Sequence, residues 1–235
     1  MRFAALIFFY ALCCGLLVTG CSDGLSPRIA ATVLSVNGPV IFGTGEQKDF
    51  HAVTPESRID GGSLVKTLDG ARLDLALLPA ALVQVSSNSE IQIEELKVSK
   101  DGNETSDAMR DRVARIRLNH GKITVLFSPS GKRAPEFSIN SGKATITADS
   151  DCLFRVQSDD TTTRVTCVQG KVYASIGAQP PIALGAGYFQ QWPSTRLETI
   201  AATDDAEAQI DVVDSLEIGN QLRKLQSDWR NRRPF

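Results

Sequence analysis

The sequence is poor in the residues that most catalytic and metal sites require. It contains two histidines, His51 in a polar stretch and His120 in a predicted turn, and neither lies near a Gly-x-Ser-x-Gly nucleophile motif. The histidines and cysteines do not have the spacing of a metal site. The pairs Gly131-Lys132 and Gly142-Lys143 lack the upstream glycine of a phosphate-binding loop. We therefore expect no enzyme, no cofactor and no metal, and a hydrolase ranks last among the functions considered.

The sequence also lacks an excess of charge of either sign. Its 25 basic side chains are nearly balanced by 27 acidic ones. Loss of the N-terminal leader described below would remove one further cation, Arg2. A chain so close to neutral has no basic surplus with which to bind phosphate backbones. We therefore expect no nucleic-acid partner.

Residues 1–20 have the layout of a cleaved export signal. One cation, Arg2, precedes an apolar run from Phe3 to Val18, and small residues then precede a cysteine. Val18-Thr19-Gly20-Cys21 resembles the lipobox of bacterial lipoproteins, in which the cysteine is acylated and the chain is cut just before it. Several acyl chains on one residue would hold the protein durably on a membrane. The alternative is an uncleaved anchor helix, because the apolar run almost reaches the roughly 20 residues that span a bilayer.

The residues after the leader predict a tether and a compartment. Residues 21–30 include glycine, serine and proline and have little apolar content, so they are typical of a flexible spacer. Ser22 after the cysteine resembles the sorting signal for the outer membrane, since an aspartate there would retain the protein at the inner membrane. We expect a body anchored through lipid on Cys21, at the periplasmic face of the outer membrane rather than the inner one.

Few cysteines remain for the folded body. Cys13 and Cys14 leave with the leader and Cys21 carries lipid, so only Cys152 and Cys167 are left. An even remainder in an oxidising compartment favours a disulfide. The alternative is a pair of buried free thiols.

The residues around these two cysteines predict a β-hairpin. Apolar side chains alternate along 152–156 and 163–167, and residues 158–161 have the composition of a turn. A loop centred between Asp159 and Asp160 would place Cys152 opposite Cys167 and Phe154 opposite Val165. Directly opposed residues of antiparallel strands are close enough for a disulfide.

The rest of the chain consists of short alternating segments separated by turns. Segments such as 72–77 and 123–127 are typical of strands, and they succeed one another every 8 to 12 residues or so. Many short strands indicate an all-β body, either a stacked-sheet sandwich or a short solenoid-like body. We divide the chain into a leader (1–20), a tether (21–30), a β domain (31–200) and a helical tail (201–235).

Spaced glycines and alternating apolar residues form a series of short motifs across roughly residues 32–192. The motifs are Val36-Asn-Gly38, Arg58-Ile-Asp-Gly-Gly-Ser-Leu64, Thr67, Ala71-Arg-Leu-Asp-Leu75, Ser89-Glu-Ile-Gln-Ile93, Leu118-Asn-His-Gly121, Phe137-Ser-Ile139, Thr166-Cys-Val-Gln-Gly-Lys-Val172 and Leu184 to Gly187. Together they resemble a FecR domain. The resemblance implies an all-β periplasmic domain that, in sensor members, relays the occupancy of a transporter to a cytoplasmic sigma factor.

The chain departs from the sensor members in three places. Only Met1 and Arg2 precede the apolar run, so the cytoplasmic anti-sigma segment of the sensors has no counterpart. Residues 149–152 stand where an Arg-Gly-Thr segment is typical, and residues 79–81 replace an Asp-Gly turn. We therefore carry over the fold and the compartment, and expect no sigma-regulating activity.

The tail predicts helical structure. Its acidic residues come early and its basic residues late, which complements a helix dipole, and Gly219-Asn220 predicts a break, giving two short helices or one kinked helix. Apolar residues keep a helical spacing and would form one stripe. That stripe either packs on the β body or docks on another envelope protein. Its residues are Ile210, Val213, Leu216 or Ile218, Leu222, Leu225 and Trp229.

These observations favour a non-catalytic lipoprotein whose FecR-like domain acts as a protein-interaction or sensing module for an envelope partner. In the tail, the interaction residues would be Leu222, Leu225 and Trp229. The alternative is a module that binds cell-wall or surface polysaccharide. Its stacking rings would be Tyr173, Tyr188 and Trp192, which otherwise belong to the core or its rim.

Overall fold

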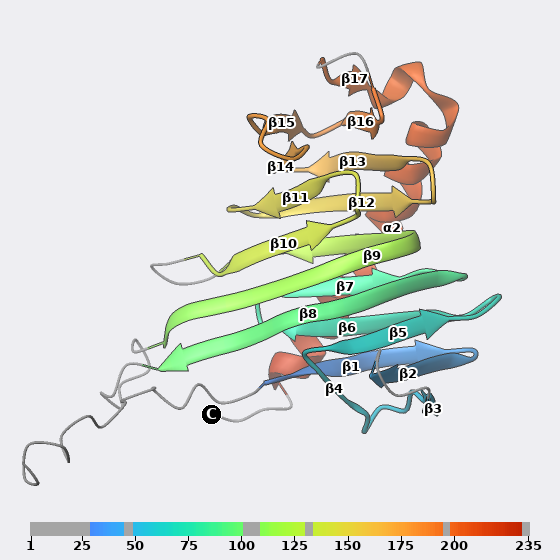
Figure 1. Cartoon of the computed structure of the whole chain (residues 1–235), viewed down its shortest axis with the longest axis vertical. Helices are drawn as coiled ribbons and strands as arrows, with labels where there is room; N and C mark the ends of the chain where they lie inside the picture. The colour runs from blue at the N-terminus through green and yellow to red at the C-terminus, as the bar shows by residue number, and fades with distance from the viewer. Residues whose placement is uncertain (1–28, 45–48, 101–108, 130–133, 195–197, 232–235) are drawn as a thin grey trace, which may run out of the picture.

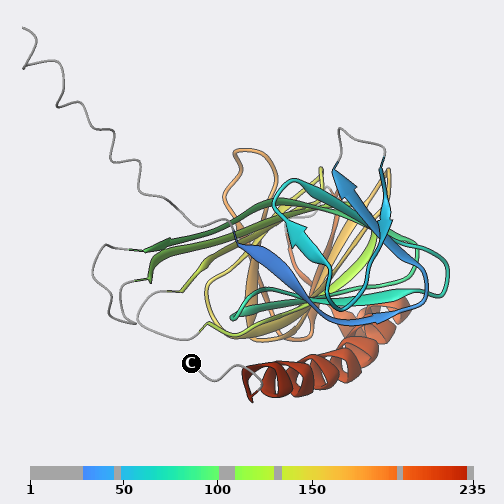
Figure 2. The same ribbon diagram turned by 90° about the horizontal axis from the view of Figure 1, so that it is seen from below.

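The computed structural model describes residues 29–44, 49–100, 109–129, 134–194 and 198–231 (Figure 1). Within these ranges the chain folds into two layers of β-strands with one long helix against one of them (Figures 1 and 2). The predicted all-β stacked-sheet body with a C-terminal helical tail is confirmed. The leader, the tether up to residue 28 and Cys21 lie outside the described residues.

Among the described residues, nine strands form the first layer. They pair antiparallel except for β9 and β10, which run parallel. In spatial order they are β3 (His51–Ala52), β2 (Val40–Thr44), β5 (Ser63–Thr67), β8 (Ser89–Lys100), β9 (Met109–Phe127), β10 (Glu136–Asn140), β11 (Thr145–Ala148), β14 (Lys171–Ser175) and β15 (Ile182–Gly185).

The second layer shares strand β9 with the first. Up to His120, β9 pairs with β8, and from Gly121 onward it pairs with β12 and β7. This long strand therefore crosses from one layer to the other and ties them together. The second layer runs in the order β4 (Arg58–Asp60), β1 (Ala30–Asn37), β6 (Arg72–Leu78), β7 (Ala81–Val85), β9, β12 (Cys152–Ser158), β13 (Thr163–Gln169), β16 (Tyr188–Trp192) and β17 (Ile200–Ala201).

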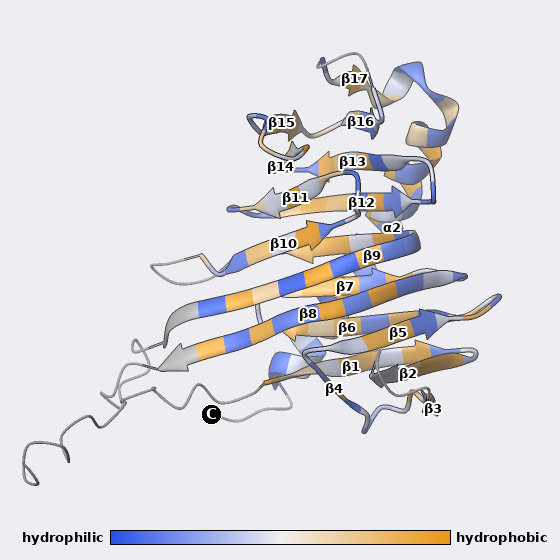
Figure 3. Cartoon of the chain, in the orientation of Figure 1, coloured by the Kyte–Doolittle hydropathy of each residue, from blue (hydrophilic) through white to orange (hydrophobic). Residues whose placement is uncertain are grey.

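The main core fills the space between the layers. Alternation along the strands, visible on β8 and β9 in Figure 3, turns one set of side chains inward. Leu73 and Leu75 of the second layer and Ile91 and Ile116 of the first are fully buried in this core. Burial of these and the other apolar side chains between the layers is the main source of the stability of the body.

A second apolar cluster lies on the outer side of the second layer, under helix α2 (Ala206–Asn231). The helix follows η2 (Ala202–Asp204) and contacts β7, β9, β12 and β13. All five residues of β7 are buried, because one face meets the core and the other meets α2. Figure 2 shows the helix lying along the outside of the body.

The alternative of two short helices broken at Gly219-Asn220 is wrong, because α2 is continuous from Ala206 to Asn231. Gly219 instead permits close packing on the sheet. A Cβ atom at this position would lie 2.6 Å from Cδ2 of Leu153. The glycine therefore lets the helix lie close to the sheet at Leu153.

The cysteine hairpin forms as β12 and β13, but its predicted register is wrong by two residues. Phe154 lies opposite Cys167, Val156 lies opposite Val165, and a bulge separates Leu153 from Phe154. Cys152 and Cys167 are consequently not opposed, and both are free thiols in this structure.

The physical reason for the shifted register is the turn. The Asp159 carboxylate accepts hydrogen bonds from the backbone N–H groups of Thr161 at 2.7 Å and Thr162 at 2.6 Å. The N–H of Asp159 also donates to the carbonyl oxygen of Thr162. These bonds close the turn later than the sequence pattern indicates, and the last opposed pair is Ser158 with Thr163.

Candidate functional site

A row of buried polar side chains crosses the outer face of the second layer beneath α2. The strand registers place Asp74, Gln84, Thr124, Arg155 and Thr166 side by side on β6, β7, β9, β12 and β13. Each is at most 2% exposed. Burying polar groups costs free energy unless they find partners. Gln84 pairs with Asp74 and Thr124 with Arg155 within the row, and the helix supplies further partners to Asp74 and Arg155.

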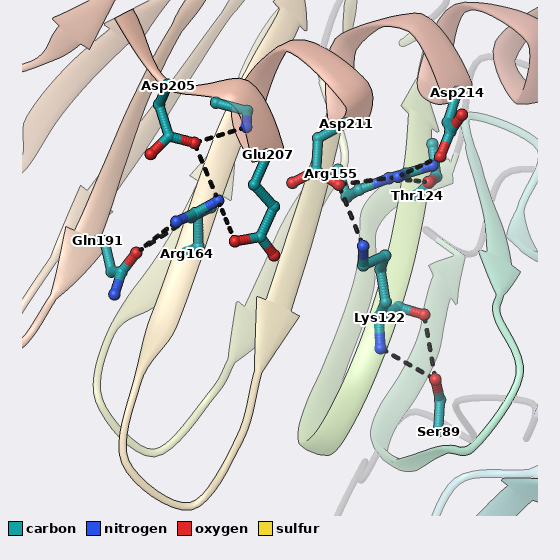
Figure 4. Close-up of polar contacts among 11 residues, drawn as sticks. Ser89, Lys122, Thr124, Arg155, Arg164, Gln191, Asp205, Glu207, Asp211 and Asp214 are labelled. Atoms are coloured by element: carbon teal, nitrogen blue, oxygen red, sulfur yellow. Dashed lines mark hydrogen bonds and ion pairs between the residues drawn. The ribbon is translucent and has the colours of Figure 1, made fainter. Parts of the chain in front are cut away.

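Arg155 is the centre of the contact between sheet and helix (Figure 4). Its NH1 donates to Oδ1 of Asp211 at 2.9 Å and to Oδ2 of Asp214 at 3.3 Å, while its Nε donates to Oγ1 of Thr124. Lys122 Nζ donates to the same Asp211 oxygen at 3.1 Å. The Arg155 and Asp211 side chains are 3% and 1% exposed, so this ion pair is shielded from solvent.

A second ionic contact fixes the start of the helix. NH1 of Arg164 lies 2.8 Å from Oε2 of Glu207 and 3.4 Å from Oδ1 of Asp205, and the guanidinium also donates to Gln191 (Figure 4). The same Asp205 oxygen accepts the N–H of Ala208 at 2.8 Å, which is the hydrogen bond of an N-cap residue. The position where α2 begins and its rotation about its axis are thus set together.

The second half of α2 combines apolar and amide contacts with the sheet. Leu222 is fully buried in a cluster that includes Leu82, Leu126 and Leu153. Gln221 Nε2 donates to Oδ2 of Asp74 at 3.3 Å. Burial raises the pKa of the Asp74 carboxyl, and the hydrogen bond from Gln84 opposes that rise.

Apart from Leu222, the buried residues of α2 are small or polar, so the prediction of one continuous apolar stripe is wrong. The helix is rotated so that Asp211 meets the buried cations. Apolar residues of its first half consequently face outward: Ile210 is 59% exposed, Val213 67% and Leu216 37%. We call these three residues the outer ridge of α2. The buried residues of the helix are Ala208, Asp211, Ser215, Gly219, Leu222 and Gln226.

The tail residues predicted to bind a partner are divided between several environments. Leu222 is fully buried against the sheet, and Leu225 is half-buried. Trp229 is half-buried and lines a groove of about 660 Å³ together with Ala31, Leu77 and other residues at the end of β1 and β6. None of these three residues belongs to the outer ridge.

The aromatic rings proposed for polysaccharide binding are not brought to one surface. Trp192 is 1% exposed and belongs to the main core, so it cannot stack on a sugar. Tyr188 is 44% exposed on β16 of the second layer, while Tyr173 is half-buried on β14 of the first.

The two thiols of the body are both buried. Burial raises the pKa of Cys167 to about 11. Burial and the neighbouring Cys167 raise the pKa of Cys152 well above its usual range. Both groups are therefore protonated near neutral pH, and a protonated thiol is a poor nucleophile.

The polar row was missed at the level of sequence, although a signal for it exists. Gln84 and Arg155 interrupt strands that are otherwise apolar, at positions facing away from the core. On a solvent-exposed sheet such residues need no explanation. They are buried because helix α2, which comes later in the chain, covers them, and its acidic residues pair with Arg155.

The described residues contain no cluster of three or more histidine, cysteine or acidic side chains that could hold a metal ion. No helix among them has both the length and the apolar character that crossing a membrane requires.

Comparison with known proteins finds a family match to part of the chain. Residues 63–173, from the start of β5 into β14, match the family described as "FecR protein". The match includes Arg155 and Arg164 and ends before α2. No curated protein matches the chain.

Two crystal structures described as a "putative anti-sigma factor from Parabacteroides distasonis ATCC 8503" are similar to the chain. They are 14% and 15% identical to it, with a TM-score of 0.41 in each case. The aligned parts cover 58% of this chain and 57% of each of the other chains. The chain thus spans little more than half the length of either structure.

Proposed function

We propose that this chain is a non-catalytic protein-interaction module of the cell envelope, and that it docks on a protein partner through the outer ridge of α2. The observation that carries the proposal is the exposure of Ile210, Val213 and Leu216 on a helix that buried ion pairs hold against the body. A helix free to rotate would turn these side chains toward the sheet. Held in place, they form an exposed apolar patch, which is typical of a binding surface.

The way α2 is held explains why the ridge is suited to binding. Asp205, Glu207 and Asp211 use their charges on Arg164, Lys122 and Arg155. The ridge is therefore ordered before any partner arrives. Association then costs less conformational entropy than it would for a helix that folds on binding.

The anchoring part of the proposal rests on the sequence. We propose that Cys21 is acylated and that the body lies in the periplasm on the outer membrane, as the lipobox-like residues 18–21 and Ser22 indicate. The test is incorporation of labelled palmitate, with Cys21→Ser as the control, combined with fractionation of the two membranes. An unlabelled protein that keeps residues 1–20 would contradict it.

The docking part is tested by chemical crosslinking in intact membranes followed by capture, so that a contact too weak to survive detergent is retained. The full-length chain carrying Val213→Asp is compared with Asn220→Asp, a matched substitution at an exposed position of the same helix. We expect at least tenfold less of a specific partner with Val213→Asp and wild-type amounts with Asn220→Asp. Equal recovery from both variants would refute the ridge as the binding surface.

The same experiment separates the other functions considered. Retention on purified cell wall or glycan, with no ridge-dependent protein partner, would establish the polysaccharide module instead. Ridge-dependent recovery of a protein that binds a sigma factor would establish a regulatory role.

A further inference from the structure

We infer that the occupant of the outer ridge is the outer ridge of a second copy of this chain, packed antiparallel about a two-fold axis at Val213. This inference rests on the proposed function, because it names the partner of the same surface. In such a pair, residues equally distant from Val213 in the sequence oppose one another. Ile210 of one copy then meets Leu216 of the other, and Val213 meets its own counterpart.

The shape of the ridge fits a self-complementary contact. Its three side chains are spaced by three residues, so they lie along one side of the helix over roughly 9 Å at 1.5 Å per residue. The ridge is symmetric about its middle residue, with one branched aliphatic side chain of similar size on each side. An isologous two-fold interface brings the same patch of both copies together, so Ile210 of one copy has to fit against Leu216 of the other.

Charge on the exposed side of α2 selects the antiparallel arrangement. The first half and its approach carry the exposed acids Asp204 and Glu217, together with Glu207 and Asp214, which also pair with Arg164 and Arg155 of the same chain. In the second half, Arg223, Lys224 and Arg230 outnumber the exposed acid Asp228.

An antiparallel pair places the basic half of one copy beside the acidic half of the other. Lys224 then approaches the segment that contains Asp204 of the second copy. A parallel pair would place acids against acids, with Glu217 facing its own counterpart, and like charges so placed repel. The helix dipoles also oppose each other favourably only when the helices are antiparallel.

The size of the contact predicts its strength. Stable interfaces bury about 800 Å² on each partner, and three ridge side chains with their polar neighbours fall short of that. Two copies anchored on the same membrane would meet at a much higher effective concentration than two free copies. We expect dimers on the membrane and monomers in dilute detergent solution.

Cysteine crosslinking in intact membranes tests the geometry. Under mild oxidation, full-length Val213→Cys should form a disulfide-linked dimer, because this residue lies on the two-fold axis. Gln209→Cys and Glu217→Cys should each fail to link to themselves, since the two copies of either residue are separated by roughly 12 Å along the helices. Coexpressed Gln209→Cys and Glu217→Cys should link to each other. Cys152 and Cys167 are buried, so the unsubstituted chain gives the background.

Each pattern of products decides the inference. The inference is supported if Val213→Cys links to itself and the mixed pair also links, each at least tenfold above background. Adding Ile210→Lys should abolish both products. Self-linking at Gln209→Cys and Glu217→Cys as well would mean parallel packing and overturn it. If Val213→Cys gives only background while Val213→Asp still loses a captured partner, the second copy is refuted and the proposed docking function stands.

Discussion

At the scale of single residues, Arg155 decides where α2 lies. A cation buried in the middle of a sheet face is costly unless an anion and further hydrogen bonds accompany it. Asp211 supplies the anion, and Thr124 supplies a further acceptor. The pair of Arg155 and Asp211 therefore contributes less to overall stability than to selecting one rotation and one position of the helix.

Asp211→Ala should destabilise the protein strongly, because it leaves Arg155 buried without its partner. We expect a loss of about 3–5 kcal/mol in the free energy of unfolding, measured by urea denaturation. Asp214→Ala is the control. Its side chain is 53% exposed, so its loss should cost less than about 1 kcal/mol. Equal effects of the two substitutions would show that burial of the pair is unimportant.

Cys167 should make stability depend on alkaline pH. The folded protein holds the thiol proton up to a pKa of about 11, above the ordinary value of 9.0. Between these two values the unfolded chain has lost the proton and the folded chain has kept it, so the free energy of unfolding falls as pH rises from 9 toward 11. Urea denaturation across this range checks it, with Cys167→Ala as the comparison. A slope that the substitution leaves unchanged would assign the effect to other groups.

At the scale of elements, the strands follow from the sequence and the register and helix rotation do not. The pattern around Phe137 and Ile139 predicts a strand because alternation is local. The register of β12 and β13 depends on the hydrogen bonds of Asp159 within the turn, which alternation does not contain. The outward rotation of Ile210 depends on Arg155, more than fifty positions away, so an apolar spacing alone points the ridge to the wrong side.

Gly219 shows the same conflict between local and tertiary preference. In an isolated helix, Gly219→Ala would gain about 1 kcal/mol. In this protein it should lower the melting temperature, because the new Cβ would lie 2.6 Å from Leu153. Asn220→Ala at the exposed neighbouring position should have little effect or stabilise slightly. In a Leu153→Ala background, Gly219→Ala should lose most of its cost, and a cost unchanged there would rule out this contact as the cause.

At the scale of the whole molecule, the FecR match and the folding unit have different boundaries. The match begins at residue 63 and ends at residue 173. Strand β1 pairs with β6, β16 pairs with β13, and α2 covers the outer face of the second layer. All three contacts join a strand within the match to an element outside it.

A fragment containing only residues 63–173 should therefore fail to fold cooperatively, whereas residues 29–231 should unfold in one sharp transition. The shorter piece would expose Leu82, Leu126 and Leu153 to water and leave Arg155 and Thr166 without the helix, and apolar surface of that extent drives aggregation. Dispersion of the amide NMR spectrum and the cooperativity of urea unfolding distinguish the two pieces. A well-dispersed spectrum and a single transition for residues 63–173 would mean that α2 and the flanking strands are additions to an independent domain. In that case residues 63–173 would fold without α2, and α2 would only dock on them.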